Sequence, residues 1–402
     1  MFSLGLAFLA SLSYAAAAPT TQLGFSNTTI ADVKANLLQI ATHSWELGTA
    51  AEALTELETP TLSVFSSKFP PPSNLAASVV SSAVDVLSIA STVVKEKPAN
   101  SQTLIAGDGA VGDPASVGVS VLLANWTRTQ LSDTSFSSAA TTQLNYLLNI
   151  APRSDDGAIS HRSDQVQLWA DFIYMAPPFI AYYGALIGGN DGETLLQTAY
   201  DQIRLYRQNL LDEDAGLWRH IALGQGTDPT HWATGNAWAA AGMLRVLETI
   251  KHSSASKKFI SQQKDLLSWV DDILTSTWQH QRSDGGLYNV IDDSSTFLDT
   301  ASTALMAAAT FRWSILTNDL SHVSAANNAM SLIQSKVNSD GWLLDTVDPE
   351  TFHAPLADGE HSPEGQAFVL LLQSAYRDYN SILGEFASVK SSVADAITNA
   401  AT

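Results

Sequence analysis

The tetrapeptide Ala215-Gly216-Leu217-Trp218 has counterparts at three other places in the chain, and this recurrence decides the fold. The counterparts are Asp156-Gly157-Ala158-Ile159, Gly285-Gly286-Leu287-Tyr288 and Asp340-Gly341-Trp342-Leu343. Their glycines, taken at 157, 216, 286 and 341, are 59, 70 and 55 residues apart, about the length of one helical hairpin with its loops. We expect each glycine to form a tight turn at positive φ, followed by a short extended pair. Such spacing indicates one supersecondary unit that is used repeatedly.

Long Ala-, Leu- and Val-rich windows with helical spacing fill the rest of the chain. Helices are predicted near residues 30–57, 74–97, 114–130, 134–151, 163–188, 191–211, 230–252, 256–280, 295–317, 319–337, 361–379 and 381–399. Pro177-Pro178 should kink or split the fifth of them. Short links alternate with longer segments that carry the repeated element. The pattern predicts an all-α protein, a single (α/α)6 barrel of six helical hairpins. An open α-solenoid is the alternative, although a stricter repeat period would be expected of it.

Composition excludes several classes of function. The 402 residues carry 20 Lys and Arg against 40 Asp and Glu, a formal net charge of -20. Nucleic acids and anionic membrane surfaces bind basic patches, so neither is an expected partner. The chain has no cysteine, which rules out disulfides and thiolate chemistry. Catalysis would therefore depend on carboxylates, histidines or hydroxyls, and no metal site is predicted because His220 and His231 lack metal-ligand spacing.

The amino terminus predicts export. Residues 1–18, MFSLGLAFLASLSYAAAA, contain an apolar stretch too short to span a bilayer, followed by small residues typical of a signal-peptidase site. We expect residues 1–18 to be a signal peptide and residues 19–402 to form the barrel of a secreted, extracellular protein. The sequons at Asn27 and Asn125 agree with a glycoprotein.

Candidate site residues fall in the longer segments, which should gather at one end of the barrel. Asp171 lies among Trp169, Phe172 and Ile173, where a carboxyl is expensive to bury unless it is paired or neutral. A neutral carboxyl is what a general acid needs, although a structural aspartate is the alternative. On the predicted helix at 163–188, Asp171 and Met175 would share one face, since they are four residues apart.

Two further groups of residues are candidates for the same cleft. Trp232 and Trp238 flank a glycine near a predicted helix start and could stack on a sugar ring, with core packing as the alternative. Asp113 precedes another predicted helix, where it could act as an N-cap or as a second active-site carboxyl. The acids at 292, 293 and 299 are expected to be solvated loop and first-turn charges.

The sequence resembles the unsaturated glycuronyl and rhamnogalacturonyl hydrolases, which are six-hairpin glycosidases. The resemblance covers most of the chain after about residue 100. It rests on five segments in a fixed order, Gly157 to Arg162, Trp169 to Phe179, Gly216 to His220, Trp232 to Trp238 and Ser362 to Phe368. It implies that Asp171 is the catalytic aspartate and Asp113 a second active-site aspartate. It also implies substrate contacts from His161, His220, Trp232 and Trp238, and we add Met175 and His231 to the predicted substrate-binding residues.

The chemistry that this resemblance implies uses no cofactor. The substrate is an oligosaccharide with a C4=C5 double bond in its terminal uronic sugar. A carboxylic acid protonates C4, water adds at C5, and the hydrated sugar opens and releases the remainder. One departure concerns Thr234, which stands where family members commonly have arginine, and Ala237 stands where glycine is usual. Arg162, beside His161, could supply the missing cation, because a guanidinium grips a carboxylate through two hydrogen bonds.

Other functions on the same barrel remain open at this stage. A uronate polysaccharide lyase would use a His or Tyr base, and an inverting glycosidase would use Asp171 and Asp113 as its acid and base. A non-catalytic glycan-binding barrel is a third alternative, because fold does not fix function.

Overall fold

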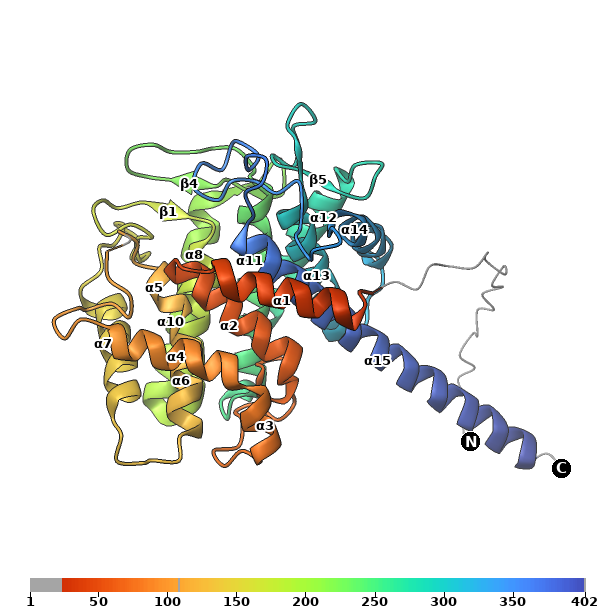
Figure 1. Ribbon diagram of the computed structural model, residues 1–402, viewed down its shortest axis with the longest axis horizontal. Coiled ribbons are helices and arrows are strands. Elements are labelled where there is room, and N and C mark those ends of the chain that lie inside the picture. The colour runs from red at the N-terminus through yellow and green to blue at the C-terminus, as the bar shows by residue number, and fades with distance from the viewer. Residues whose placement is uncertain (1–23, 108, 401–402) are drawn as a thin grey trace, which may run out of the picture.

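Six helical hairpins close into a ring in the computed structural model, which describes residues 24–107 and 109–400 (Figure 1). The outer helices are α1 (Asn27–Ile40), α4 (Val84–Glu96), α7 (Ser135–Asn149), α10 (Gly189–Leu210), α12 (Ile260–Gln279) and α14 (Val323–Lys336). The inner helices are α2 (Ser44–Glu58), α6 (Gly118–Thr127), α9 (Pro177–Ile187), α11 (Ala233–His252), α13 (Thr300–Thr317) and α15 (Pro363–Ala400). Each inner helix contacts the next, and α15 contacts α2. The ring is therefore closed, which confirms the (α/α)6 barrel and excludes the open solenoid. The predicted signal peptide lies outside the described residues.

Several predicted helices have different bounds in the structure. The helix predicted at 30–57 is two helices, because the Glu46 carboxylate accepts hydrogen bonds from the Thr42 and His43 amides and so starts α2 afresh. The helices predicted at 74–97 and 114–130 are also divided, by α3 (Ala77–Ser82) before α4 and by α5 (Asp113–Ser116) before α6. Conversely, the last two predicted helices are one, α15, because neither Asn380 nor Ser381 is a strong helix breaker.

The helix predicted at 163–188 is wrong in its first part. Strand β1 (Leu168–Trp169) precedes a one-turn helix, α8 (Phe172–Met175), and α9 then begins at Pro177. The extended conformation is favoured because β1 pairs with β4 (Ile221–Ala222) from the next long segment. The expected break at Pro177-Pro178 is confirmed, since proline fits the first turn of a helix but not its interior.

The long segments meet at one end of the barrel, as predicted, where each leads into the first turn of an inner helix. Strand β2 (Leu211–Asp212) pairs with β3 (Leu217–Trp218), and β5 (Leu287–Tyr288) pairs with β6 (Leu298–Asp299), so the apolar pairs after two of the glycines are extended as expected. One glycine was placed wrongly in the repeat. Gly285, not Gly286, has the positive φ (94°), because the turn is completed one residue earlier.

Helix α11 is buried on all sides, which is why its sequence looks apolar or small throughout. All residues of α11 from Ala233 to Ile250 are buried. Gly242 allows α11 to approach α8 closely, since a Cβ atom there would lie 2.2 Å from the Ile173 carbonyl oxygen. This contact fixes the turn that follows Asp171.

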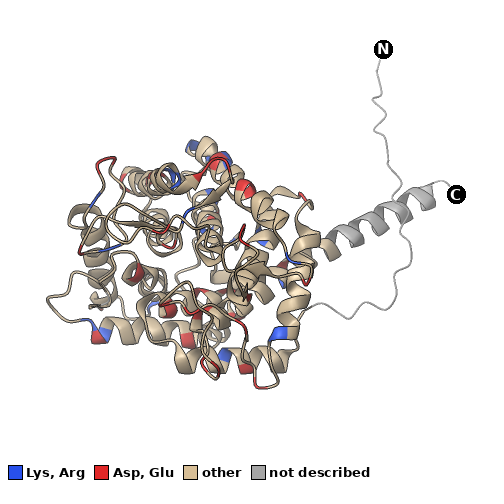
Figure 2. Cartoon of the chain, turned by 90° about the horizontal axis from the view of Figure 1, so that it is seen from above, with Lys and Arg blue, Asp and Glu red and all other residues tan. Residues whose placement is uncertain are grey.

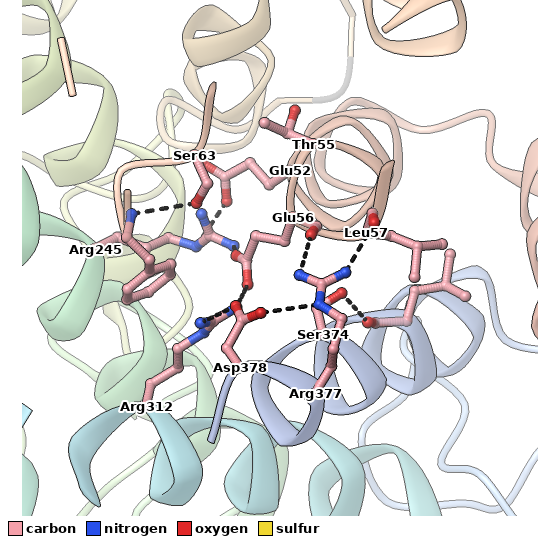
Figure 3. Close-up of polar contacts among 12 residues, drawn as sticks. Glu52, Thr55, Glu56, Leu57, Ser63, Arg245, Arg312, Ser374, Arg377 and Asp378 are labelled. Carbon is pink, nitrogen blue, oxygen red and sulfur yellow. Dashed lines mark hydrogen bonds and ion pairs between the residues drawn. The ribbon is translucent and has the colours of Figure 1, made fainter. Parts of the chain in front are cut away.

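A buried ionic cluster ties four inner helices together further along the barrel axis. Figure 3 shows Arg245 and Arg312 reaching from α11 and α13 toward glutamates of α2. Arg245 Nε lies 2.9 Å from Glu52 Oε2, and Arg312 Nη2 lies 2.7 Å from Glu56 Oε2. On α15, Asp378 accepts from Arg312 at 2.6 Å. Removing an arginine of this cluster would leave buried glutamates without their counter-charge, so the cluster restrains how the four helices pack.

Positions of Lys and Arg are interspersed with positions of Asp and Glu along the described part of the chain, as the view in Figure 2 shows. None of the described helices combines the length and the apolar character needed to cross a membrane.

Candidate active site

Asp171 lies at the end of the barrel where the long segments gather. The pairing of β1 with β4 places it there, and the Ala170 amide extends this pairing by donating to the His220 carbonyl oxygen at 2.9 Å. Only 9% of Asp171 is exposed. Its Oδ2 atom lies 3.5 Å from His220 Nε2, and within the described residues both of these buried atoms lack a hydrogen-bond partner. The two groups therefore face each other at a distance that a small movement would convert into a hydrogen bond.

His220 is fully buried and held from its other side by Asp228. Its Nδ1 atom lies 2.9 Å from Asp228 Oδ2, while Thr230 donates to Asp228 from its amide and its hydroxyl. Burial would favour a neutral imidazole, but the two flanking carboxylates outweigh it and raise the pKa of His220. Burial also opposes ionisation of Asp228, yet the hydrogen bonds from His220 and Thr230 lower its pKa to about 2. No motif in the sequence pointed to Asp228.

Asp113 and His161 lie together, as the resemblance implies. Asp113 is the first residue of α5, and its Oδ1 atom is 3.6 Å from His161 Nε2. The Trp169 ring stacks on the His161 ring with 4.8 Å between centroids. Burial is the main reason why the pKa of His161 is lowered to about 4. His161 is therefore a neutral ring near neutral pH, whereas the pKa of His220 is shifted the opposite way.

Three aromatic side chains surround the His220 ring. Trp169, Trp232 and Phe352 have ring centroids 5.5, 4.5 and 4.7 Å from it. Phe352 belongs to the segment between α14 and α15, and it has a φ of 63°, which is unusual for a residue with a side chain. Strained residues of this kind are concentrated at functional sites. Nothing in the local sequence indicates that Phe352 belongs to this site.

Asn289 connects two walls of the site. Its side-chain oxygen accepts from the Trp232 indole at 3.1 Å, and its side-chain nitrogen donates to the Phe352 carbonyl at 2.8 Å. Asn289 thus restrains both the Trp232 ring and the backbone of Phe352. Beside Phe352, the exposed His353 places its Nε2 atom 3.3 Å from Asp228 Oδ2.

Thr234, two residues after Trp232, forms a buried hydrogen-bonded pair with Asp299. The Thr234 hydroxyl donates to Asp299 Oδ2 at 2.8 Å, and Asp299 caps α13 by accepting from the Ala301 and Ser302 amides. The expectation that Asp299 is solvated was wrong. It is fully buried, because the Val347 amide and Thr234 complete its hydrogen bonds in place of water. The Thr234 hydroxyl is therefore already engaged in a hydrogen bond to Asp299.

Glu364, in the first turn of α15, is a further buried carboxyl near Asp171. It is 4% exposed, and burial together with the negative charges of Asp171, Glu46 and Asp299 raises its pKa well above the usual range. A hydrogen bond from Trp45 acts in the opposite direction. Burial thus favours the neutral form of the Glu364 carboxyl. Its motif was visible in the sequence, but its burial depends on the packing of α15 against α2.

Four other predicted substrate-binding residues have different surroundings in the structure. Trp238 is 1% exposed and packs on Tyr174 and Phe368 inside the barrel, so core packing explains it. Met175 is also buried. His231 pairs with Asp292 at 2.7 Å, and Arg162 lies at the rim, 3.2 Å from Asp164. Trp232 packs against His220, but it is only 1% exposed, because Phe352 and Asn289 also contact it.

The site contains acids and bases but no cluster suited to a metal ion. In residues 24–107 and 109–400, no three His, Asp or Glu side chains are arranged as metal ligands. The geometry offers a nearly buried carboxyl that faces an imidazole of raised pKa, together with a second, neutral imidazole and three aromatic side chains. Such a set can deliver and accept protons, and it can hold a ring-shaped ligand.

Comparison with known proteins identifies the class. Residues 112–358 match the sequence model of Glycosyl Hydrolase Family 88. No curated protein matches the chain. The matched segment contains Asp113, Asp171 and His220, so the fold and the site define a glycoside hydrolase on a six-hairpin barrel. The chain belongs to Glycosyl Hydrolase Family 88, which confirms the family resemblance in the sequence.

Solved structures share the fold over nearly the whole chain. A possible member of the GH105 family from Klebsiella pneumoniae is 17% identical with a TM-score of 0.71, and the match covers 90% of this chain and 96% of that one. A possible GH105 member from Salmonella enterica is 18% identical with a TM-score of 0.67, covering 88% and 93%. An unsaturated glucuronyl hydrolase specific for heparin is 12% identical with a TM-score of 0.58, covering 88% and 96%.

Proposed function

We propose that this glycoside hydrolase acts on oligosaccharides that end in an unsaturated uronic sugar, by hydrating the C4=C5 double bond. The observation that carries the proposal is the Asp171–His220 pair, in which a nearly buried carboxyl faces an imidazole at 3.5 Å. A single proton-transfer centre suits hydration, because the proton that is given to C4 is matched by one that returns from the attacking water. The heparin-specific unsaturated glucuronyl hydrolase that shares the fold supports the same class of substrate.

Each step assigns work to residues of this chain. Asp171 delivers a proton to C4, and the double-bond electrons form the new C–H bond, which leaves positive charge at C5 and the ring oxygen. Water adds at C5 and returns a proton to the Asp171 carboxylate. Asp113, beside the neutral His161, orients a sugar hydroxyl or this water. The hydrated sugar then opens and releases the remaining oligosaccharide, so no cofactor takes part in the proposed scheme.

One observation favours a second candidate, a uronate lyase. The His161 ring is neutral above about pH 4 and has a buried Nδ1 atom without a hydrogen-bond partner among the described residues. A neutral imidazole could remove the proton at C5 of a uronate and so start β-elimination. Absorbance of the unsaturated sugar separates the two reactions, since a hydrolase consumes the double bond and a lyase creates it.

The assay uses lyase-digested pectin, glucuronan and glycosaminoglycan fragments as separate substrates. The proposal expects a loss of absorbance with at least one of them, and the wild-type reaction should release one sugar for each double bond consumed. A gain in absorbance on the undigested polymers would favour the lyase. No change on any substrate would contradict both.

We also propose that the protein is exported and glycosylated. The proposal rests on the composition of residues 1–18 and on Asn27, which is exposed at the first position of α1. Asn125 is half-buried and is the poorer acceptor. Amino-terminal sequencing and glycosidase treatment of the protein from culture medium test this. A retained Met1, or an unchanged mass after treatment, would contradict export or glycosylation respectively.

A further inference from the structure

Four titratable side chains, alternately basic and acidic, form a chain from the surface to Asp171. His353 Nε2 lies 3.3 Å from Asp228 Oδ2, and the same oxygen lies 2.9 Å from His220 Nδ1. His220 Nε2 then lies 3.5 Å from Asp171 Oδ2. His353 is exposed, whereas His220 is fully buried and the side chains of Asp228 and Asp171 are 11% and 13% exposed. The hydration scheme above uses only the last member of this chain.

The hydrogen bonds of His220 determine where its protons lie. Asp228 is a carboxylate, so it can only accept, and His220 Nδ1 must carry a hydrogen. His220 Nε2 and Asp171 Oδ2 are both buried, and each lacks a partner in the described part of the chain. A buried polar pair in this position is satisfied when one proton lies between the two atoms. Asp171 and His220 can therefore share a proton, and Asp228 decides which ring nitrogen faces Asp171.

We propose that Asp228 is a positioning residue that keeps His220 protonated and aimed at Asp171, so that the His220–Asp171 pair stores the proton delivered to C4. This inference rests on the function proposed above. In the proton-transfer step the Nε2 proton moves to Asp171 Oδ2, and the Asp171 carboxyl gives a proton to C4. The imidazole is then neutral with its hydrogen on Nδ1. The water that adds at C5 gives up one proton, which restores the pair, so one proton leaves and one returns.

The charges around His220 support the storage of a proton there. Asp171 and Asp228 face the ring from two sides and raise its pKa, although burial acts against them. His161 lies close enough for its charge and that of His220 to oppose each other, and it stays neutral. On the far side, His353 faces Asp228. The remaining faces meet Trp169, Trp232 and Phe352, which limit the access of water to the ring.

The first test is the pH dependence of kcat in Asp228→Asn. The amide keeps the shape but removes the negative charge, so His220 should lose its stored proton at lower pH. We expect the alkaline limb of kcat to move by about 1–3 pH units toward acid, as for loss of a close opposite charge. In addition, kcat should fall by at least about tenfold while KM changes by less than about threefold. A purely structural role would lower activity at all pH values alike, and an unmoved limb would overturn the inference.

Two further variants test whether the alkaline limb of kcat shifts in the predicted direction. His353→Gln removes the outer base but leaves the Asp228–His220 bond, so the alkaline limb should stay in place or move toward higher pH. Asp271→Asn is the matched control, because Asp271 pairs with His322 at 2.9 Å on the outer helices, away from Asp171. It should leave the limb unmoved. A shift toward acid in either variant would overturn the role assigned to Asp228.

A second readout does not depend on turnover. NMR titration of the imidazole nitrogens, assigned with His220→Gln, measures the protonation of His220 directly. We expect His220 in the wild type to hold its proton above the usual histidine range, and to lose it at lower pH in both Asp228→Asn and Asp171→Asn. If His220 titrates in the same range in all three proteins, the inference fails even when substrate is consumed. If the titrations shift as expected but no unsaturated substrate is consumed, only the proposed function fails.

Discussion

Replacing Glu52 by glutamine should change how the stability of the protein depends on pH. Burial raises the pKa of Glu52 from 4.5 to about 7, despite the opposing charge of Arg245. The folded state therefore binds more protons than the unfolded state between these two values, and stability falls as pH rises through this window. At about 1.4 kcal/mol for each pKa unit, ionising Glu52 costs the fold about 3 kcal/mol. Glutamine is never ionised, so the variant should lack this loss.

The assay is urea unfolding followed by tryptophan fluorescence at pH 5 and pH 8. Wild type should lose about 3 kcal/mol more than Glu52→Gln between these two conditions, and the proteins should differ little at pH 5. Glu96→Gln is the matched control, because Glu96 is exposed on α4, and it should behave as wild type. Equal pH dependence in wild type and Glu52→Gln would refute the reasoning. It would mean that Arg245 keeps Glu52 ionised throughout.

Three other substitutions test the Thr234–Asp299 hydrogen bond, the Asn289–Phe352 hydrogen bond and the role of Arg162. Thr234→Val removes the hydrogen bond to Asp299 at 2.8 Å and should lower the free energy of unfolding by about 1–3 kcal/mol. Urea unfolding measures this loss, and unchanged stability would show that Asp299 finds another donor. Asn289→Ala frees the Phe352 carbonyl and should speed proteolytic cleavage of the segment that carries Phe352, whereas unchanged cleavage would show that the segment is held by other contacts. Arg162→Ala should raise KM about tenfold with little change in kcat if Arg162 binds the sugar carboxylate, and unaltered kinetics would make it a surface charge.

The barrel could be predicted from the sequence because its cause is local and repeated. A glycine turn followed by an apolar pair occurs in four of the long segments, and Ala-rich windows between these turns have helical spacing. The helix predicted across Asp171 failed because β1 is formed by pairing with β4, about 50 residues away, and no local pattern reports such a partner. The same reason explains why Asp299 was expected in solvent.

The candidate site was predicted in part. Asp171, Asp113, His161 and His220 lie together, since short motifs and the family resemblance point to them. Asn289 and Phe352 were missed because each acts through a contact with a segment distant in the sequence. Asp228 lies only eight residues from His220, and it was missed because no motif marks it. Trp238 shows the opposite error, because it was predicted to bind substrate but packs against Tyr174 inside the barrel.

Asp171→Asn, measured by the absorbance of unsaturated uronate oligosaccharides, tests the central claim most directly. The amide has nearly the same shape but cannot deliver a proton, so wild type should consume the double bond, while the variant should be slower by at least about 10²–10⁴-fold. Circular dichroism and unfolding midpoints of the variant should match wild type, which separates loss of chemistry from loss of fold. A folded Asp171→Asn variant that consumes the double bond within a few-fold of the wild-type rate would contradict the account.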